Sequence, residues 1–287
     1  MLHRITPALI PAFVLLMGCD RVNDPLVEPT GNNGNPGNGT VMRKVLLEDF
    51  TGHTCVNCPA AARVASSLKD VYEEDLIVVG VHCTSTFAAP ANPPNPNGSY
   101  ATDFRTPAGD AYENALNIFF LPNGAVNRKP FNNSITLGSA AWGSAVADVI
   151  GQEADFDIWF SQLQHDPDNN TVTAEVKVAV LNPVTGDHNL TIYLTEDSVI
   201  DWQKDLEADP DDVPDYVHRH VLRTNLNSAW GAPVVVGQAL AGDTITLTYT
   251  NFSMNPAWVA DHCSLVAYVH NNNTYEVMQV EEAHFQH

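Results

Sequence analysis

The chain has little positive charge, few cysteines and no long apolar segment beyond its first residues. Its 287 residues include 13 Lys and Arg against 34 Asp and Glu, which gives a formal net charge of −21. No stretch clusters Lys or Arg, so the sequence has no basic footprint for a phosphate backbone, and we expect no nucleic-acid partner. No later run reaches 18 uninterrupted apolar residues, and therefore no transmembrane helix is expected.

The start of the chain reads as an export signal. A weakly basic opening is followed by the apolar run Ile5–Met17 and then by Gly18 and Cys19. This ending resembles a bacterial lipobox, which predicts a signal peptide over residues 1–18 and a lipid on Cys19 that anchors the chain to a membrane. The alternative is an ordinary secretory peptide that is cut nearby, with Cys19 incidental.

Composition divides the remaining chain into a tether and two folded parts. Residues 19–40 are rich in Asn, Gly and Pro, cannot bury apolar surface, and are predicted to be a flexible tether. Residues 41–152 have an α/β rhythm, and residues 153–287 have a β rhythm. The fold class expected is a thioredoxin-like α/β domain followed by an all-β, immunoglobulin-like sandwich.

Hydrophobic periodicity places the elements of both parts. In the first part we expect strands in 41–50 and 76–82, helices in 59–74, 108–117 and 140–150, and an inserted loop over 84–107. In the second part the expected strands include 171–181, 189–196, 243–250, 263–270 and 275–280. Strand–helix–strand order in the first part favours parallel pairing, whereas alternation and turn clusters in the second favour an antiparallel sandwich.

Two further features of the second part suggest binding but are explained as well by ordinary structure. The segment 205–215 is dense in acidic residues, and we interpret it as a solvated turn. His218 and His220 lie in an extended stretch that puts both on one face, where a metal is conceivable. Without a third ligand, packing is the better interpretation.

Cys55 and Cys58 form a Cys-x-x-Cys motif where the first strand gives way to the first helix. Amides and the dipole at a helix N-terminus favour a thiolate, so a redox role predicts an exposed, reactive Cys55 and a shielded Cys58. Two alternatives stay open: a structural disulfide, and a metal site formed with His53 and Cys83. Cys83 and Cys263 are otherwise expected to be buried.

The segment Glu48–Pro59 resembles the thioredoxin superfamily. The resemblance implies that Asp49, six residues before Cys55, is a buried acid that moves protons to the second cysteine. It also implies that Pro122 is a cis-proline that packs against the disulfide. Thr54 stands where the superfamily usually has Trp. The catalytic residues that follow are Cys55, Cys58, Asp49 and Pro122, with no cofactor and no metal.

The whole chain resembles the twenty-eight-kilodalton outer-membrane-protein family, the Omp28-related lipoproteins. Besides the signal and the cysteine segment, the resemblance includes 126–128, 216–223, 230–231 and 277–283. It implies an outer-membrane location, periplasmic or surface-facing. The function expected is thiol–disulfide exchange on envelope proteins that carry thiols or disulfides. The alternative is a non-catalytic binding or adhesion lipoprotein whose cysteine pair only staples a loop.

Overall fold

The computed structural model describes residues 40–285, which belong to one compact unit. The predicted signal peptide, Cys19 and nearly all of the predicted tether lie outside the described residues. The helices are Cys58–Tyr72 (α1), Pro107–Ala115 (α2) and Trp142–Ala147 (α3). The strands are Val45–Thr51 (β1), Leu76–His82 (β2), Asn123–Val126 (β3), Thr136–Leu137 (β4), Phe156–Asp166 (β5), Thr171–Val180 (β6), Val184–Thr185 (β7), His188–Glu196 (β8), Val199–Lys204 (β9), Asp212–His218 (β10), Val221–Asn225 (β11), Ala232–Val235 (β12), Gln238–Ala239 (β13), Thr244–Ser253 (β14), Cys263–Asn271 (β15) and Val277–His284 (β16). Most of the regular structure is β-sheet, with few helices.

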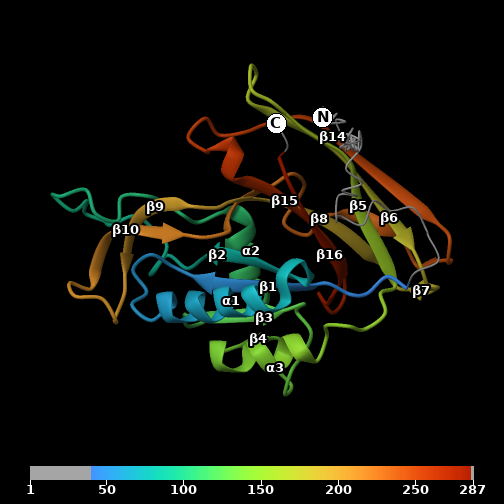
Figure 1. The fold of residues 1–287 in the computed structure, drawn as a ribbon, viewed down its shortest axis with the longest axis horizontal. Helices are drawn as coiled ribbons and strands as arrows, with labels where there is room; N and C mark the ends of the chain where they lie inside the picture. The colour runs from blue at the N-terminus through green and yellow to red at the C-terminus, as the bar shows by residue number, and fades with distance from the viewer. Residues whose placement is uncertain (1–39, 286–287) are drawn as a thin grey trace, which may run out of the picture. The chain divides into compact units, whose positions relative to one another are not determined.

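The first part of the described chain is a mixed sheet covered by helices on both faces (Figure 1). β1 and β2 pair in parallel, β3 runs antiparallel to β1, and β4 runs antiparallel to β3. Val45 and Leu47 face a core shared with α1 and α3, whereas Leu46 and Phe50 face a second core that includes residues of α2. Burial on both faces explains why β1 opens with the apolar run Val45–Leu47 and why β2 is apolar from Leu76 to Val81.

Each of the two longer helices has a proline in its first turn. Pro59 occupies the first turn of α1, where its missing N–H costs nothing. Pro107 does the same in α2, and the side chain of Thr106 caps that helix by accepting a hydrogen bond from the N–H of Gly109 at 3.0 Å. The helices therefore start close to the positions that the sequence predicts.

The second part of the described chain contains a sandwich. β14, β6 and β5 form an antiparallel sheet, and its apolar face packs on β8 and β15 in one core. Buried and half-buried positions alternate along β6, which buries Val172, Val176 and Val178 on one side as the sequence predicts. All five strands predicted in this part are present, with bounds within a few residues of those expected.

The two parts share one large sheet. Its strand order is β16-β15-β8-β11-β2-β1-β3-β4, with β12 paired to β8. The junction is narrow: β11 pairs with β2 in parallel through the residue pair Val221 and Gly80. The backbone N–H of Gly80 also donates to the carbonyl of His220 at 2.8 Å. The predicted boundary near residue 152 thus separates two rhythms in the sequence, while hydrogen bonds join the strands on either side of it.

A buried ion pair fixes this arrangement from within. The guanidinium of Arg128, after β3, donates to both oxygens of Glu48 at 2.7 Å, and both side chains are essentially inaccessible. Tyr193 on β8 donates to Glu48 at 2.8 Å, and Arg128 also donates to the hydroxyl of Tyr268 on β15 at 3.2 Å. The cluster therefore connects β1 to strands of the second part through side chains as well as through the sheet.

Candidate functional site

The cysteine pair lies in the turn between β1 and α1. Cys55 and Cys58 form a disulfide, and α1 begins at Cys58 itself. The turn is tightened by two backbone hydrogen bonds, from Cys55 N–H to the carbonyl of Gly52 (3.0 Å) and from Cys58 N–H to the carbonyl of Cys55 (3.2 Å). The sequence therefore places the pair correctly at a strand-to-helix junction.

The predicted exposure of Cys55 is wrong for this oxidised state. Cys55 is 3% exposed and Cys58 is 1% exposed. The expectation treated the pair as the open end of an isolated strand–helix unit. Two segments distant in sequence instead fold over it, and we call residues 84–106 and 199–218 together the cover.

The hairpin of β9 and β10 forms one half of the cover. The N–H of Lys204 donates to the carbonyl of His53 at 2.8 Å, and the N–H of Leu206 donates to the carbonyl of Val56 at 2.9 Å. The buried side-chain amide of Gln203 donates to the carbonyl of Cys55 at 3.1 Å. These bonds satisfy carbonyls of the cysteine turn that would otherwise face solvent, so the hairpin seals the turn.

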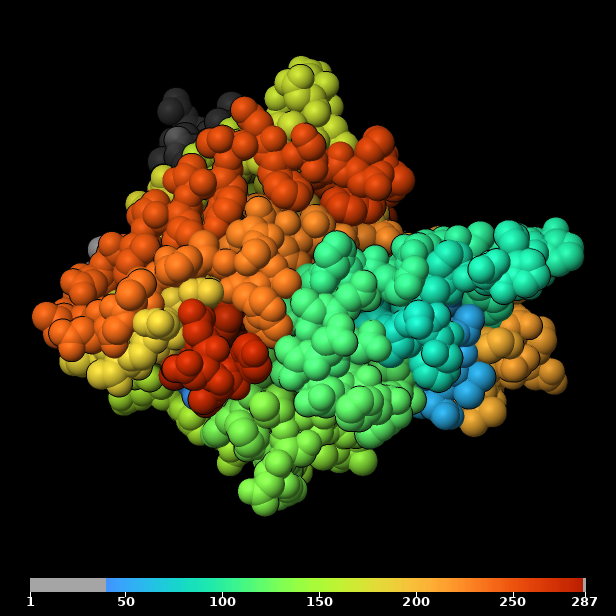
Figure 2. All heavy atoms as spheres, turned by 180° about the vertical axis from the view of Figure 1, so that it is seen from behind, coloured from blue at the N-terminus to red at the C-terminus, as the bar shows by residue number. Residues whose placement is uncertain are grey.

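The inserted loop, residues 84–106, forms the other half of the cover. The N–H of Thr54 donates to the carbonyl of Phe87 at 3.1 Å, and the chain passes so close that a Cβ on Gly52 would meet Phe87 at 2.6 Å. Tyr100 and Phe104 are buried in this loop, which therefore packs more closely than its Pro- and Asn-rich sequence predicts. Figure 2 shows the loop in teal and the hairpin tip in orange on either side of the blue cysteine segment.

Asp49 is buried on the α1 face of β1. It is 4% exposed, and its Oδ1 has no hydrogen-bond partner among the described residues. Burial without a cation raises its pKa from 3.8 to about 7, because the charged carboxylate is poorly solvated there. A carboxyl group with this pKa exchanges its proton near neutral pH, as the proton-moving role expected for Asp49 requires.

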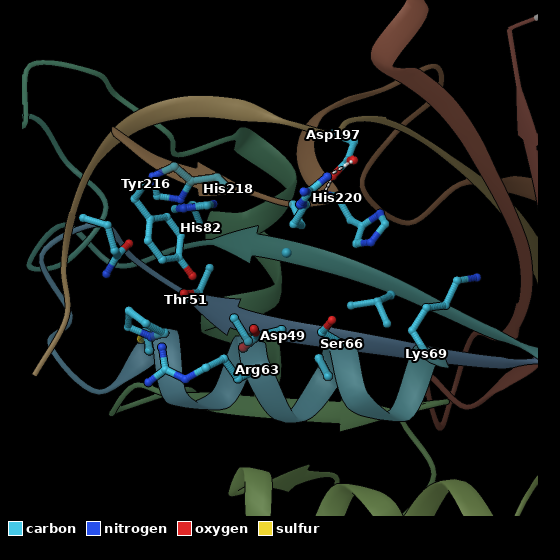
Figure 3. Close-up of a pocket in the computed structure, with 18 of the residues that line it drawn as sticks. Asp49, Thr51, Arg63, Ser66, Lys69, His82, Asp197, Tyr216, His218 and His220 are labelled. Atoms are coloured by element: carbon cyan, nitrogen blue, oxygen red, sulfur yellow. Dashed lines mark hydrogen bonds and ion pairs between the residues drawn. The ribbon is translucent and has the colours of Figure 1, made fainter. Parts of the chain in front are cut away.

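Asp49 and Cys58 line one groove of about 430 Å³. α1 contributes Arg63, Ser66 and Lys69 to one wall, and the segment 216–220 contributes the other, with Asp49 on the strand between them (Figure 3). Asp49 and one cysteine of the pair therefore lie along the same groove.

Histidines line the far wall in their neutral form. His82 is 3% exposed and stacks on Phe104, with ring centroids 4.6 Å apart, while His218 packs beside it. Burial lowers the pKa of both imidazoles, to about 4 for His218. Both ring nitrogens of His82 lack a hydrogen-bond partner among the described residues, and so does Nε2 of His218. The groove thus presents several unsatisfied polar atoms.

Pro122 is placed beside the site but not in the groove. Its bond to Leu121 is cis, as the sequence resemblance implies. It directly precedes β3, whose first residue, Asn123, is opposite Phe50 near the end of β1. The structure therefore brings Cys55, Cys58 and Asp49 together around one turn, and puts Pro122 at the neighbouring strand end.

The same geometry bears on the other cysteines and on the metal alternative. Cys83 and Cys263 are free and buried, as expected, and burial raises the pKa of both thiols. With Cys55 and Cys58 joined, the sulfurs are not free thiolates for a metal. Within residues 40–285, no group of three or more His, Cys, Asp or Glu is arranged to hold a metal ion.

The hairpin of the cover is what sequence reasoning missed. The acidic segment 205–215, interpreted as a solvated turn, supplies Asp205 and Glu207 to ion pairs with Arg63 on α1 at 3.0 and 2.7 Å. Asp212 likewise accepts a hydrogen bond from Lys204 at 2.8 Å. The signal in the sequence was the high density of acidic residues in this segment. Such a segment is expected to form ion pairs with cations elsewhere in the fold, as it does with Arg63.

The described chain combines a mixed sheet, which has a disulfide at the start of its first helix, with a β-sandwich. The protein therefore belongs to the class of mostly β-sheet proteins with few helices. The model of the family "Outer membrane protein Omp28" matches residues 109–287, which is more than half of the chain. The chain therefore belongs to this family. Its predicted outer-membrane location is thereby confirmed. The match begins after the cysteine pair, so the pair lies outside the matched segment.

Two solved structures with TM-scores above 0.5 support the fold, and a third match is similar over less of the chain. HBP35 of Porphyromonas gingivalis is 18% identical with a TM-score of 0.63, over 86% of this chain and 76% of that one. A protein of Agrobacterium tumefaciens is 13% identical with a TM-score of 0.51, over 86% of this chain and 97% of that one. A domain of the outer membrane lipoprotein Omp28 from Porphyromonas gingivalis is 22% identical with a TM-score of 0.31, over 46% of this chain and 89% of that one. No curated protein matches the chain. Among residues 40–285, no helix has the length and apolar character needed to cross a membrane.

Proposed function

We propose that this outer-membrane protein catalyses thiol–disulfide exchange on envelope proteins through Cys55 and Cys58, in a thioredoxin-like α/β part. The observation that carries the proposal is the groove that Cys58 shares with Asp49, a buried acid whose pKa lies near 7. The element order β1-α1-β2-α2-β3-β4-α3, with strand order β2-β1-β3-β4, supports the thioredoxin-like description.

The exchange has two balanced steps. In the reduced pair, the Cys55 thiolate attacks one sulfur of a substrate disulfide, forms a mixed disulfide, and releases the other substrate sulfur as a thiolate. The Cys58 thiol then gives its proton to the Asp49 carboxylate and attacks Cys55 Sγ. This step closes the Cys55–Cys58 bond and releases the second substrate sulfur. The substrate gains two electrons, which the pair loses.

The reduction potential and a trapping variant test this function together. A catalytic pair is expected to have a potential of roughly −120 to −270 mV, and Cys58→Ser is expected to accumulate mixed disulfides with envelope proteins through Cys55. Cys55→Ser is the matched control and is expected to trap none. A potential below about −300 mV together with an empty trap contradicts the proposal.

The second candidate is a non-catalytic binding or adhesion lipoprotein with a structural disulfide. The near-complete burial of both cysteines favours it, because a staple needs no access for a partner sulfur. The same two measurements separate the candidates. Under this alternative the reduced thiols also show no preferential alkylation at Cys55.

We also propose that Cys19 carries the lipid that holds the protein at the membrane. The support is the lipobox-like sequence Leu16–Cys19 together with the family's location. Cys19→Ser is expected to leave uncleaved precursor or release soluble protein, as read by membrane fractionation and mass spectrometry. A variant that still fractionates with membranes, in cells whose wild-type protein carries no acyl group on Cys19, contradicts the anchor.

A further inference from the structure

The oxidised pair is almost completely buried, and one groove runs beside it. The cover closes the outer face of the turn, where Gln203, Lys204 and Leu206 bind the cysteine-turn backbone. The groove, by contrast, reaches Cys58 from the side of α1. A folded protein surface does not fit a groove of about 430 Å³, whereas a molecule of peptide size does.

The groove contains an uncompensated cation. Every other lysine and arginine within residues 40–285 forms an ion pair with a carboxylate, but Lys69 forms none. Its ammonium donates one hydrogen bond, to the carbonyl of Leu76 at 2.9 Å, which leaves two N–H groups for a ligand. In a chain of net charge −21, a lysine without an acidic partner in a groove points to an anionic ligand.

The ligand length follows from the helix. Cys58 and Lys69 are 11 residues apart on α1, which corresponds to roughly 16 Å along its axis. The Lys69 ammonium bonds the carbonyl of Leu76 at the start of β2, beyond the end of α1, so the side chain extends away from Cys58 and does not shorten this span. Between these ends, the unpartnered atoms of Asp49, His82 and His218 offer hydrogen bonds to a polar ligand body.

We propose that this groove binds a low-molecular-weight thiol with an anionic group roughly 16 Å from its sulfur, and that this thiol exchanges with the oxidised pair at Cys58. The inference rests on the proposed thiol–disulfide function and names the class of its small reductant. It leaves envelope proteins as substrates of the reduced pair, once the cover has opened.

The chemistry balances with two equivalents of the thiol. The first thiolate attacks Cys58 Sγ, forms a mixed disulfide, and releases Cys55 as a thiolate that takes a proton from water. The second thiolate attacks the ligand sulfur of that mixed disulfide and leaves as the oxidised dimer of the thiol. Cys58 departs as a thiolate and receives the proton held by Asp49. The cysteine pair gains two electrons and two protons, one proton from water and one from Asp49.

The experiment compares three peptides that differ only in the charge of one end: acetyl-Cys-Gly-Gly-Gly-Glu-amide and its Gln and Lys counterparts. Their second-order rates of reducing the Cys55–Cys58 bond are measured at low ionic strength, with 2-hydroxyethyl disulfide as the reference target. The net charge alone predicts that the Lys peptide is fastest and the Glu peptide slowest. The proposal expects the Glu peptide to be at least fivefold faster than the Gln peptide, with an advantage that disappears in high salt.

Two pairs of variants locate the effect. Lys69→Gln is expected to abolish the preference for the Glu peptide, whereas Lys129→Gln, outside the groove, is expected to keep it. Ser66→Trp fills the groove and is expected to slow the Glu peptide at least tenfold. Ser67→Trp places the same side chain on the next residue of α1, which does not line the groove, and is expected to leave the rate unchanged.

The failures are distinguishable. If all three peptides reduce the folded protein with the order set by net charge, or if Ser66→Trp behaves like Ser67→Trp, the small-thiol site is wrong and the exchange function stands. If none of the peptides reduces the pair until the protein is unfolded, the exchange function and the site that rests on it are both contradicted.

Discussion

Glu48 and Asp49 are neighbours on β1, both buried, and have opposite surroundings. Glu48 faces the α2 side, where Arg128 and Tyr193 donate to its carboxylate. Asp49 faces the α1 side, where its Oδ1 has no partner within residues 40–285 and its pKa rises to about 7. Alternation of side chains along a strand is what separates two adjacent acids into two environments.

The difference shows how one strand serves both architecture and chemistry. A carboxylate with a bidentate guanidinium partner stays charged and holds strands from both parts of the chain together. A carboxyl group without a partner titrates near neutral pH and suits proton exchange with a thiol. The comparison can be tested by removing each partner in turn.

The largest effect is expected from Arg128→Met. It leaves Glu48 buried without its cation, and the free energy of unfolding should fall by about 3–5 kcal/mol, as measured by denaturant titration. Lys129→Met is the control, because Lys129 forms an exposed pair with Asp148 and should cost about 0–1 kcal/mol. Equal losses in the two variants would mean that the buried pair does not hold the parts together.

A smaller effect of opposite sign is expected from Asp49→Asn. The folded protein holds a proton on Asp49 between pH 3.8 and about 7 that the unfolded chain has released, so stability falls as the pH rises through this window. At pH 8 the variant should therefore be more stable than the wild type by about 2–4 kcal/mol, and near pH 4 the gain should vanish.

Unfolding titrations of the oxidised protein at pH 4, 6 and 8 measure this linkage. Asp70→Asn, an exposed carboxyl on α1 in the same groove, should show no such pH-dependent gain. A constant difference between Asp49→Asn and wild type at all three pH values would show that Asp49 is not held protonated.

The cover is expected to respond to Gln203→Ala. Loss of its hydrogen bonds to the cysteine turn should weaken the closed state by about 1.4 kcal/mol, which is tenfold in the opening equilibrium. Alkylation of Cys55 in the reduced protein should therefore accelerate about tenfold, as read by mass spectrometry. Gln164→Ala, on an exposed position of β5, should alkylate at the wild-type rate.

The smallest effect is expected from Arg63→Gln. Arg63 pairs with Asp205 and Glu207 of the hairpin, but its side chain is 47% exposed, so solvent and salt screen these pairs. Alkylation of Cys55 should rise about twofold at low ionic strength and should match the wild type in ~0.5 M salt. A salt-independent increase would instead assign Arg63 a packing role.

The sequence predicted what depends on local pattern. The helix at Cys58, the parallel strand at Leu76 and the alternation of β6 all follow from periodicity and caps. The burial of Asp49 was implied by the resemblance to the thioredoxin superfamily, and the structure confirms it. The cover could not be predicted, because its contacts join residues near 53 to residues near 204 and depend on backbone carbonyls that carry no sequence signature.

The partner of Glu48 was also beyond local reasoning. Arg128 was part of the segment 126–128 that carried the family resemblance, but nothing in its neighbourhood says that it binds an acid 80 residues earlier. Such pairs are chosen by the tertiary fold, in which charge is buried only where an opposite charge meets it. The acidic turn at 205–215 is mostly exposed, as expected, but its ion pairs with Arg63 depend on the tertiary fold in the same way.

The narrow seam between β2 and β11 also bears on solubility. At Val221 and Gly80 each strand occupies what would be an open sheet edge of the other part. Open edges of apolar strands such as β2 offer unpaired N–H and C=O groups to any neighbouring chain and promote aggregation. Each part of this protein therefore covers a sheet edge of the other part. A fragment cut near residue 152 would expose an unpaired, aggregation-prone strand at the membrane surface.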